Sequence, residues 1–472
     1  MREPGIEALG RIISTQALHD SPERYPLQCH PGTRKRVLES ILRWIDADPS
    51  PSCRVFWLYG RPGVGKSAIL KTITDELAAT RPGTSRRRLA GSFFFRRGLS
   101  SCENAIHLFP TLAYQMALNV PGMRSAINQA MVFDVTIPSK ALEVQISKLI
   151  IEPFQRVCGA RQSENSTLPP ASIVIIDGLD ECAESCHQKA ILTAITAMFV
   201  NHPDIPVRFL IASRYEHHLR SAFDRPPLRD VTQRIYLDDS FPVHEDIRLF
   251  FEDKFAEIYN ENLDIMKSSA RLPWPGRMTI DMLTARAAGQ FIYAVTVVRF
   301  VGAEGCHPCK QLDNVLASSK ATATRRADVG FSALDNLYMH ILSAHPNQTL
   351  IRDILQLVRN MKCFYISPRS IAALLEIDES AISLAIRSLS SLLAIYPTIS
   401  EESNEKTTRF AALYGRTDKG IGFIHRSLTD FLEDASRSRR FHIFRSDSHV
   451  PTLLRNLALR CLRSMTTRDA PW

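Results

Sequence analysis

Residues 60–67 of this chain, GRPGVGKS, combine glycine, lysine and serine at the spacing of a phosphate-binding loop. The glycines let backbone N–H groups converge on a phosphate, and a helix that begins near Lys66 points the positive end of its dipole at the same place. Lys66 would neutralise β- and γ-phosphate oxygens, and the hydroxyl of Ser67 would bind Mg²⁺. The apolar run VFWLY before the loop and the amphipathic segment after it favour a nucleotide site over a chance turn. The residues expected around the phosphates are Gly60, Arg61, Pro62, Gly63, Val64, Gly65, Lys66, Ser67 and Ala68.

A group of carboxylates follows a second apolar run, in IVIIDGLDE at residues 173–181. A phosphate-binding loop needs an acidic residue at the end of a neighbouring strand to hold Mg²⁺ through water. Three carboxylates this close together would repel one another without a cation. We assign Asp177 to the metal, and either Asp180 or Glu181 to orienting or polarising the attacking water.

A third apolar run, VRFLIASR at residues 207–214, ends in an arginine. A planar guanidinium at a strand end binds phosphate oxygens in two places. Arg214 is therefore a candidate ligand of the γ-phosphate.

The elements that position these residues alternate between strand and helix. The strand candidates are short apolar runs without two-residue periodicity, as expected for a parallel sheet covered on both faces. These strands are expected at 55–59, 91–95, 173–177, 207–212 and 234–237, with helices at 34–46 and 67–79. This alternation predicts a three-layer α/β domain, and the polar stretch 159–171 is expected to be a surface loop.

From about Phe241 the pattern becomes helical. We expect helices at 244–260 and 279–300, a linker at 302–330, and two helices near 333–360. Residues 367–399 then predict a helix, a turn at Glu376–Asp378 with Asp378 as the cap, a second helix and a strand. A polar loop, a second strand (GIGFIH) and a helix complete a winged-helix pattern.

These patterns divide the chain into five parts. They are a leader with an amphipathic helix (1–50), the α/β nucleotide domain (51–240), a small helical domain with its linker (241–330), a winged-helix domain (331–440) and the start of a further helical segment (441–472).

Composition supports a globular chain of several domains. Apolar residues make up 45% of the 472 residues, charged residues make up 23%, and the net charge is +9. No apolar run is long enough to span a bilayer, and the N-terminus lacks the pattern of a secretory signal. Ten irregularly spaced cysteines fit reduced thiols, so we expect a cytoplasmic protein. The pair in CHPC (306–309), and Cys182 with Cys186, are read as free thiols because no further ligands complete a metal site.

Several motifs together resemble one family. FWLYGRPGVGKSAI, IVIIDGLDE, FLIASR, GQFIYA and FIHRSLTDFL stand in the order seen in NACHT-domain proteins, a branch of the signal-transduction (STAND) P-loop ATPases. With CHPGTRKRVLESILRWI, GSFFFRRG and LFPTLAYQMA, the spacing is most similar to that of the large basidiomycete fungal set. The resemblance runs from about Ala17 to His442.

This resemblance implies a regulated switch that holds ADP in a closed form, exchanges it for ATP and then self-associates. It also implies that the Arg214 strand lies between the loop strand and the Asp177 strand. His425 matches the winged-helix histidine that contacts the ADP β-phosphate, and the region of Thr33 and Arg34 matches the segment that edges the adenine. Without the family resemblance, the simpler interpretation is that His425 is a buried histidine whose ring forms hydrogen bonds with backbone groups. The chain departs from many relatives at Gly289, which is followed by no proline to pack on adenine.

Three functions remain open. The first is a switch that binds ATP or ADP with Mg²⁺ and hydrolyses ATP slowly, with protein partners or self-association on activation. The second is a nucleotide-binding scaffold without significant hydrolysis. The third is a winged-helix nucleic-acid binder, which is disfavoured because the would-be recognition helix from Asp378 begins with two acids and carries a single arginine, Arg387.

Overall fold

The computed structural model describes residues 3–21, 28–47, 53–79, 88–163, 172–237, 243–267, 270, 272–318, 329–360, 366–397 and 419–444. The chain divides into two compact units, Met1–Asp246 and Ile247–Trp472. The two units are described separately.

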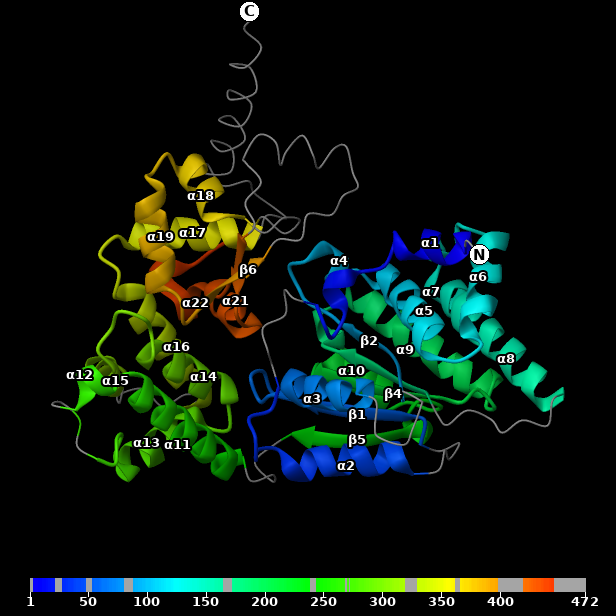
Figure 1. Cartoon of the computed structure of the whole chain (residues 1–472), viewed down its shortest axis with the longest axis horizontal. Coiled ribbons are helices and arrows are strands. Elements are labelled where there is room, and N and C mark those ends of the chain that lie inside the picture. Colours follow the sequence, from blue (N-terminus) through cyan, green and yellow to red (C-terminus); the bar gives the residue numbers. More distant parts are fainter. Residues whose placement is uncertain are drawn as a thin grey trace, which may run out of the picture. The chain divides into compact units, whose positions relative to one another are not determined.

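The first unit is built on a five-stranded parallel sheet with the strand order β2-β3-β4-β1-β5. The strands are β1 (Val55–Gly60), β2 (Leu89–Phe94), β3 (Ser172–Asp177), β4 (Val207–Arg214) and β5 (Thr232–Leu237). All five predicted strands are present. β4 lies between β1 and β3, which is the order that the family resemblance implies. Figure 1 labels β2, β4, β1 and β5 in their order across the sheet.

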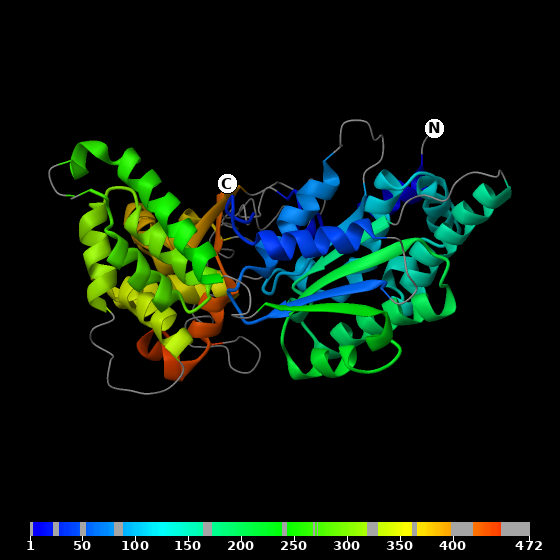
Figure 2. The ribbon, with the colours of Figure 1, turned by 90° about the horizontal axis from the view of Figure 1, so that it is seen from below.

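Helices cover both faces of this sheet. On one face, Phe56 and Leu58 of β1 pack with α2 (Lys35–Asp46) and α3 (Lys66–Ala78), the blue helices on one side of the strands in Figure 2. On the other face, Trp57 belongs to a core shared with α5 (Leu108–Asn119) and α9 (Ser185–Asn201). Successive strand residues therefore enter opposite cores, which explains the unbroken apolar runs of the sequence.

A helical segment between β2 and β3 extends the second core. It comprises α4 (Ser100–Glu103), α5, α6 (Met123–Phe133), α7 (Leu142–Ile146), a π-helical turn (Ser147–Ile151) and α8 (Glu152–Ser163), while α1 (Pro4–Gly10) packs on α6. The loop expected at 159–171 is wrong in its first part, because α8 continues through Ser163. Residues 164–171 lie outside the described ranges. A short helix, α10 (His217–Phe223), follows β4.

The helices of the second unit begin within α11 (Val243–Glu261), whose first four residues belong to the first unit. The others are α12 (Leu263–Met266), α13 (Arg277–Ala287), α14 (Phe291–Val301), α15 (Pro308–Ser318), α16 (Val329–Ser343) and α17 (Gln348–Asn360). The single helix expected at 279–300 is wrong: the chain breaks at Ala288 and Gly289, which both have positive φ. The linker expected at 302–330 is also wrong in part, since it contains α15.

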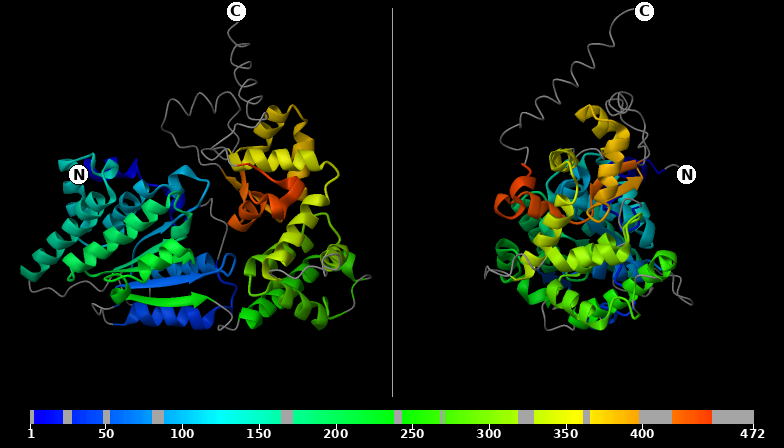
Figure 3. Two further views of the ribbon diagram at one scale, coloured as in Figure 1. Left: turned by 180° about the vertical axis from the view of Figure 1, so that it is seen from behind. Right: turned by 90° about the vertical axis from the view of Figure 1, so that its left-hand side faces the viewer.

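The last elements follow the predicted order. They are α18 (Pro368–Leu375), α19 (Glu379–Ser388), the antiparallel pair β6 (Leu393–Pro397) and β7 (Lys419–Phe423), α21 (Arg426–Leu432) and α22 (Ala435–Ser438), with β7 and α21 in orange-red in Figure 3. Asp378 caps α19 by accepting the backbone N–H of Ser380 at 2.9 Å, as predicted. The winged-helix interpretation stays a prediction, and the loop 398–418 and most of the predicted terminal segment lie outside the described residues.

None of the helices in the described ranges has both the length and the apolar character that a membrane crossing requires.

The turn after β3 gives a test of the fold. Gly178 has φ 67°, and a Cβ there would lie 3.2 Å from the carbonyl oxygen of Phe95. Gly178→Ala should therefore lower the free energy of unfolding by about 1–2 kcal/mol in chemical denaturation. Gly159→Ala is the matched control, since a Cβ there meets nothing within 4 Å in α8, and it should raise stability by about 0.5–1 kcal/mol. Equal effects of the two substitutions would contradict this account of the turn.

Candidate functional site

The phosphate-binding loop connects the end of β1 at Gly60 to the start of α3 at Lys66. Gly63 and Gly65 have φ values of 76° and 95°, a region that side chains rarely allow. A Cβ on Gly60 would lie 2.9 Å from the carbonyl oxygen of Leu237 on β5. The three glycines of the motif are therefore explained by backbone conformation and close packing.

Lys66 lies at the centre of the site. Its Nζ donates to the carbonyl oxygens of Gly60 and Arg61, both at 2.9 Å. Desolvation lowers the pKa of Lys66 to about 8, although the neighbouring carboxylate of Asp180 opposes the shift. Arg214, Asp177 and Glu181 also act on this pKa, so the fold brings all the predicted catalytic residues within electrostatic range of the lysine. The side chain is half-buried, and a bound phosphate would stabilise its charged form.

Asp177 is the last residue of β3, and it is 3% exposed. The carboxyl ends of β3, β4 and β1 lie at one edge of the parallel sheet, where ligands of open α/β sheets bind. The oxygen donors available there, the Asp177 carboxylate and the Ser67 hydroxyl, are of the kind that Mg²⁺ prefers. The residues thus fit the metal that the loop motif implies.

Asp180 and Glu181 are in different environments. Asp180 is 4% exposed; its Oδ1 accepts the backbone N–H of Arg214 at 2.8 Å, and its Oδ2 lies 3.3 Å from Arg214 Nε. Glu181 is half-buried, and its Oε2 accepts the backbone N–H of Arg97 at 3.1 Å, on the loop after β2. Asp180 is therefore buried and bonded to Arg214 at the end of β4, whereas Glu181 is partly exposed to solvent and hydrogen-bonded to the loop after β2.

The predicted adenine-edging residues precede α2. Thr33 is buried, and its hydroxyl donates to the carbonyl oxygen of His30 at 2.7 Å. Arg34 is also buried, and its Nη2 donates to the carbonyl oxygen of Val64 in the phosphate-binding loop at 2.6 Å. No sequence pattern signals this contact, because it joins residues 30 positions apart through a side chain with many rotamers.

His425 belongs to the second unit, so its contact with a phosphate stays a prediction. It is the N-cap of α21, and its Nδ1 accepts the backbone N–H of Ser427 at 3.1 Å. The hydroxyl of Ser427 lies 2.7 Å from the same nitrogen and 2.8 Å from the buried hydroxyl of Tyr338. These contacts hold the ring in one orientation.

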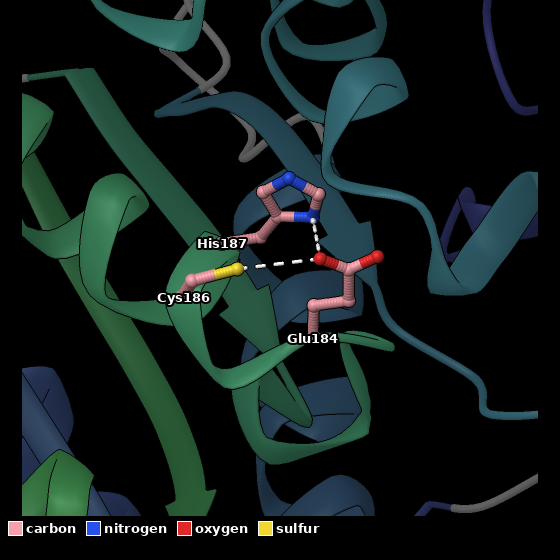
Figure 4. Close-up of side chains that lie close together, drawn as sticks. All are labelled: Glu184, Cys186 and His187. Atoms are coloured by element: carbon pink, nitrogen blue, oxygen red, sulfur yellow. Dashed lines mark hydrogen bonds and ion pairs between the residues drawn. The ribbon is translucent and has the colours of Figure 1, made fainter.

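Within the described ranges, a single group of side chains has the composition and spacing of metal ligands. Glu184, Cys186 and His187 lie in the N-cap and first turn of α9, with ligand atoms within 4.8 Å of one another (Figure 4). The Cys186 thiol donates to Glu184 Oε2 at 3.3 Å, and His187 Nδ1 lies 3.8 Å from the same oxygen. Because the group is exposed and its contacts are local, we assign it no metal.

The loop, the parallel sheet and the position of β4 between β1 and β3 define an α/β P-loop NTPase fold. The family model described as "Nephrocystin 3, N-terminal" matches residues 32–214, a range that contains the loop, Asp177 and Arg214. A comparison with curated proteins finds no match.

Solved structures with some similarity to this chain include the following three. The ORC2 protein of Aeropyrum pernix, solved as ADPNP–ADP complexes, is 11% identical, with 92% of this chain and 95% of that chain covered and a TM-score of 0.34. A Walker-type ATPase of Pyrococcus abyssi is 12% identical, with 86% and 97% covered and a TM-score of 0.35. A variant of RuvB from Thermotoga maritima is 13% identical, with 81% and 96% covered and a TM-score of 0.27. At such low similarity, the fold assignment rests on the strand order and the loop of this chain.

The lowered pKa of Lys66 predicts a pH dependence of nucleotide affinity. Phosphate oxygens would raise this pKa in the complex, so above about pH 8 binding must take up a proton. The affinity for ADP should be flat between about pH 7 and pH 8, where the terminal phosphate is already ionised, and should fall up to about tenfold per pH unit above pH 8. Calorimetry at about pH 9 in buffers of different ionisation enthalpy should detect the proton uptake.

Lys71→Gln, on the next turn of α3, is the control and should keep this dependence, because Lys71 pairs with Asp75 and not with the loop. Affinity that stays constant up to about pH 10 would contradict the assignment of Lys66.

Proposed function

We propose that the chain is an ATP- and ADP-binding switch of the NACHT type, similar to the basidiomycete fungal set, which hydrolyses ATP slowly in the cytoplasm. Nucleotide exchange would change the contact between the nucleotide domain and the winged-helix domain and so control self-association or binding of protein partners. The observation that carries the proposal is the convergence on Lys66 of Asp177, Asp180, Glu181 and Arg214 at one edge of the sheet.

The residues would share the work as follows. Backbone N–H groups of residues 63–67 and the Lys66 ammonium would bind the β- and γ-phosphates. Ser67 and Asp177 would hold Mg²⁺, which neutralises phosphate charge when bound. Arg214 would extend its guanidinium from the end of β4 towards the γ-phosphate, with its position set by Asp180.

The environments of the two carboxylates favour Glu181 as the residue that orients the attacking water. Asp180 is buried, accepts the backbone N–H of Arg214 and forms an ion pair with its guanidinium, and breaking a buried ion pair of this kind is costly. Glu181 is half-buried, so a water molecule can reach its carboxylate, which accepts several hydrogen bonds when ionised. The Arg97 N–H, from the loop after β2, would hold this carboxylate in place.

The role proposed for His425 is consistent with its hydrogen bonds. A ring nitrogen that accepts a backbone N–H carries no proton, so in the neutral ring the proton resides on Nε2. Nε2–H is then a donor suited to a phosphate oxygen. In the closed form that we propose, this donor would contact the β-phosphate of ADP.

A scaffold without significant hydrolysis is the second candidate. Both carboxylates that could act on water are engaged by protein donors, Asp180 by Arg214 and Glu181 by Arg97. If these contacts persist with ATP bound, the site binds nucleotide without activating water.

Substitution of the two carboxylates separates these candidates. Glu181→Gln should lower kcat by about 100-fold or more and change the Kd for ADP less than about threefold, because the amide cannot polarise water. Asp180→Asn should lower the midpoint of thermal unfolding in addition to kcat, because Arg214 loses the charge of its buried partner. The measurements are steady-state phosphate release and calorimetric titration. Wild-type protein that binds ATP but releases no phosphate would favour the scaffold.

Purified protein should carry adenine nucleotide. Mass spectrometry of the denatured wild-type protein should find ADP or ATP near one equivalent per chain, and Lys66→Ala should lose most of it. Lys71→Ala, which removes a cation from the same helix away from the phosphates, should retain the nucleotide. A wild type without nucleotide that also ignores added ADP with Mg²⁺ would refute the proposed function.

A further inference from the structure

We propose that Arg34 is a positioning residue that orients one peptide group of the phosphate-binding loop and makes that orientation depend on the first turn of α11. The inference rests on the proposed function, because the oriented group would bind a phosphate. It concerns Arg34, Val64 and Asp246, which are far apart in the sequence and lie together in the first unit.

The three residues form a continuous set of contacts. Arg34 is the N-cap of α2 and is 4% exposed. Its Nη2 donates to the Val64 carbonyl oxygen at 2.6 Å, and its own backbone N–H donates to Asp246 Oδ2 at 3.1 Å. Its Nε lies 3.9 Å from the same carboxylate oxygen. The guanidinium thus contacts the loop while the backbone of the same residue is held by α11.

The contact with Val64 sets the direction of the next N–H group. In a planar trans peptide, the C=O of one residue and the N–H of the following residue point in opposite directions. A carbonyl of Val64 that faces Arg34 therefore turns the N–H of Gly65 away from Arg34. Gly65 is the N-cap of α3, at the helix end where phosphates bind. The positive guanidinium also polarises this peptide, which makes the Gly65 N–H a stronger donor.

The backbone of Arg34 supports a functional interpretation. Arg34 has φ 58° and ψ 16°, a left-handed conformation that residues other than glycine rarely adopt. Such conformations persist where surrounding contacts impose them, and they concentrate at functional sites. The imposing contact here is the Asp246 carboxylate on the Arg34 N–H. Burial lowers the pKa of Arg34 and raises that of Asp246, so each charge depends on the other.

Asp246 lies where the chain leaves the nucleotide-binding unit. α11 begins at Val243 in the first unit, and from Ile247 it belongs to the second. A displacement of the first turn of α11 would release Arg34 and with it the Val64–Gly65 peptide. Coupling of this kind is reciprocal, so a bound phosphate should in turn stabilise the first turn of α11.

The test compares ADP affinity in three variants by calorimetry. Arg34→Asn keeps a residue that tolerates the left-handed conformation but cannot reach Val64, and it should weaken ADP binding about tenfold or more. Asp246→Asn keeps an oxygen that can accept the Arg34 N–H but removes the charge that balances the buried guanidinium, so it should weaken ADP binding by about three- to tenfold. Binding of adenosine, which has no phosphate, should be equal in the wild type and in Asp246→Asn.

Arg208→Gln is the matched control. Arg208 is 1% exposed and donates to a backbone carbonyl, that of Ala47 at 3.0 Å, but it has no contact with the loop among the described hydrogen bonds. This variant should lower the unfolding midpoint and leave ADP affinity within about twofold. Equal losses of affinity in Arg34→Asn and Arg208→Gln, or wild-type affinity in Asp246→Asn, would overturn the inference.

Amide hydrogen exchange gives a measurement that would not change if Arg34 only stabilised the fold. Saturating ADP should slow exchange at residues 247–250, whose N–H groups donate to the first turn of α11, in the wild type, and this slowing should be lost in Arg34→Asn. If the wild type binds no ADP, the proposed function fails, but the inference about Arg34 is still testable. Faster exchange of residues 60–67 in Asp246→Asn than in the wild type would then support it, and equal exchange would overturn it.

Discussion

The parallel pairing of β1, β4 and β3 is the constraint on which the site depends. Parallel strands end at a common edge, so the loop after β1 meets the arginine that ends β4 and the aspartate that ends β3, although the loop precedes both by more than a hundred residues. A shift of register by one residue would send Asp177 to the other face of the sheet. In β3 itself, Ile176 enters one core and Ile175 the other, so each core is packed by its own residues of the strand.

At this edge of the sheet, opposite charges lie close together and offset part of the free-energy cost of burying ionised side chains. Lys66 loses solvation where the loop closes over it, and the acidic residues of β3 and its turn offset part of that loss. Asp180 is paired with Arg214, so the buried carboxylate and the cation stabilise each other. Arg34 and Asp246 repeat the same arrangement behind the loop. The nucleotide would therefore enter a site in which much of the buried charge is already balanced before the phosphates reach the lysine.

Local sequence patterns predicted much of the fold and the core of the site. The loop, Asp177 and the five strands could be predicted because each is encoded by a short run of residues and the apolar context around it. The break at Ala288 was missed because apolar periodicity continues across it, although Gly289 is the C-terminal signal that could have located it. The contact of Arg34 with Val64 could not be predicted, since it depends on a left-handed arginine and on a tertiary approach of α11. Likewise, only the fold distinguishes Asp180 from Glu181.

The strand order also bears on how the protein is made. β1 leaves the ribosome early, but both of its neighbours in the sheet, β4 and β5, are encoded far downstream and end at Arg214 and Leu237. At elongation rates of about 5–20 residues per second, the nascent chain would carry an unpaired, strongly apolar β1 for roughly 10–40 s. During that interval, the segment VFWLYG is exposed to aggregation or to capture by chaperones. During synthesis of this domain, an apolar strand thus stays unpaired until its two neighbours in the sheet have been made.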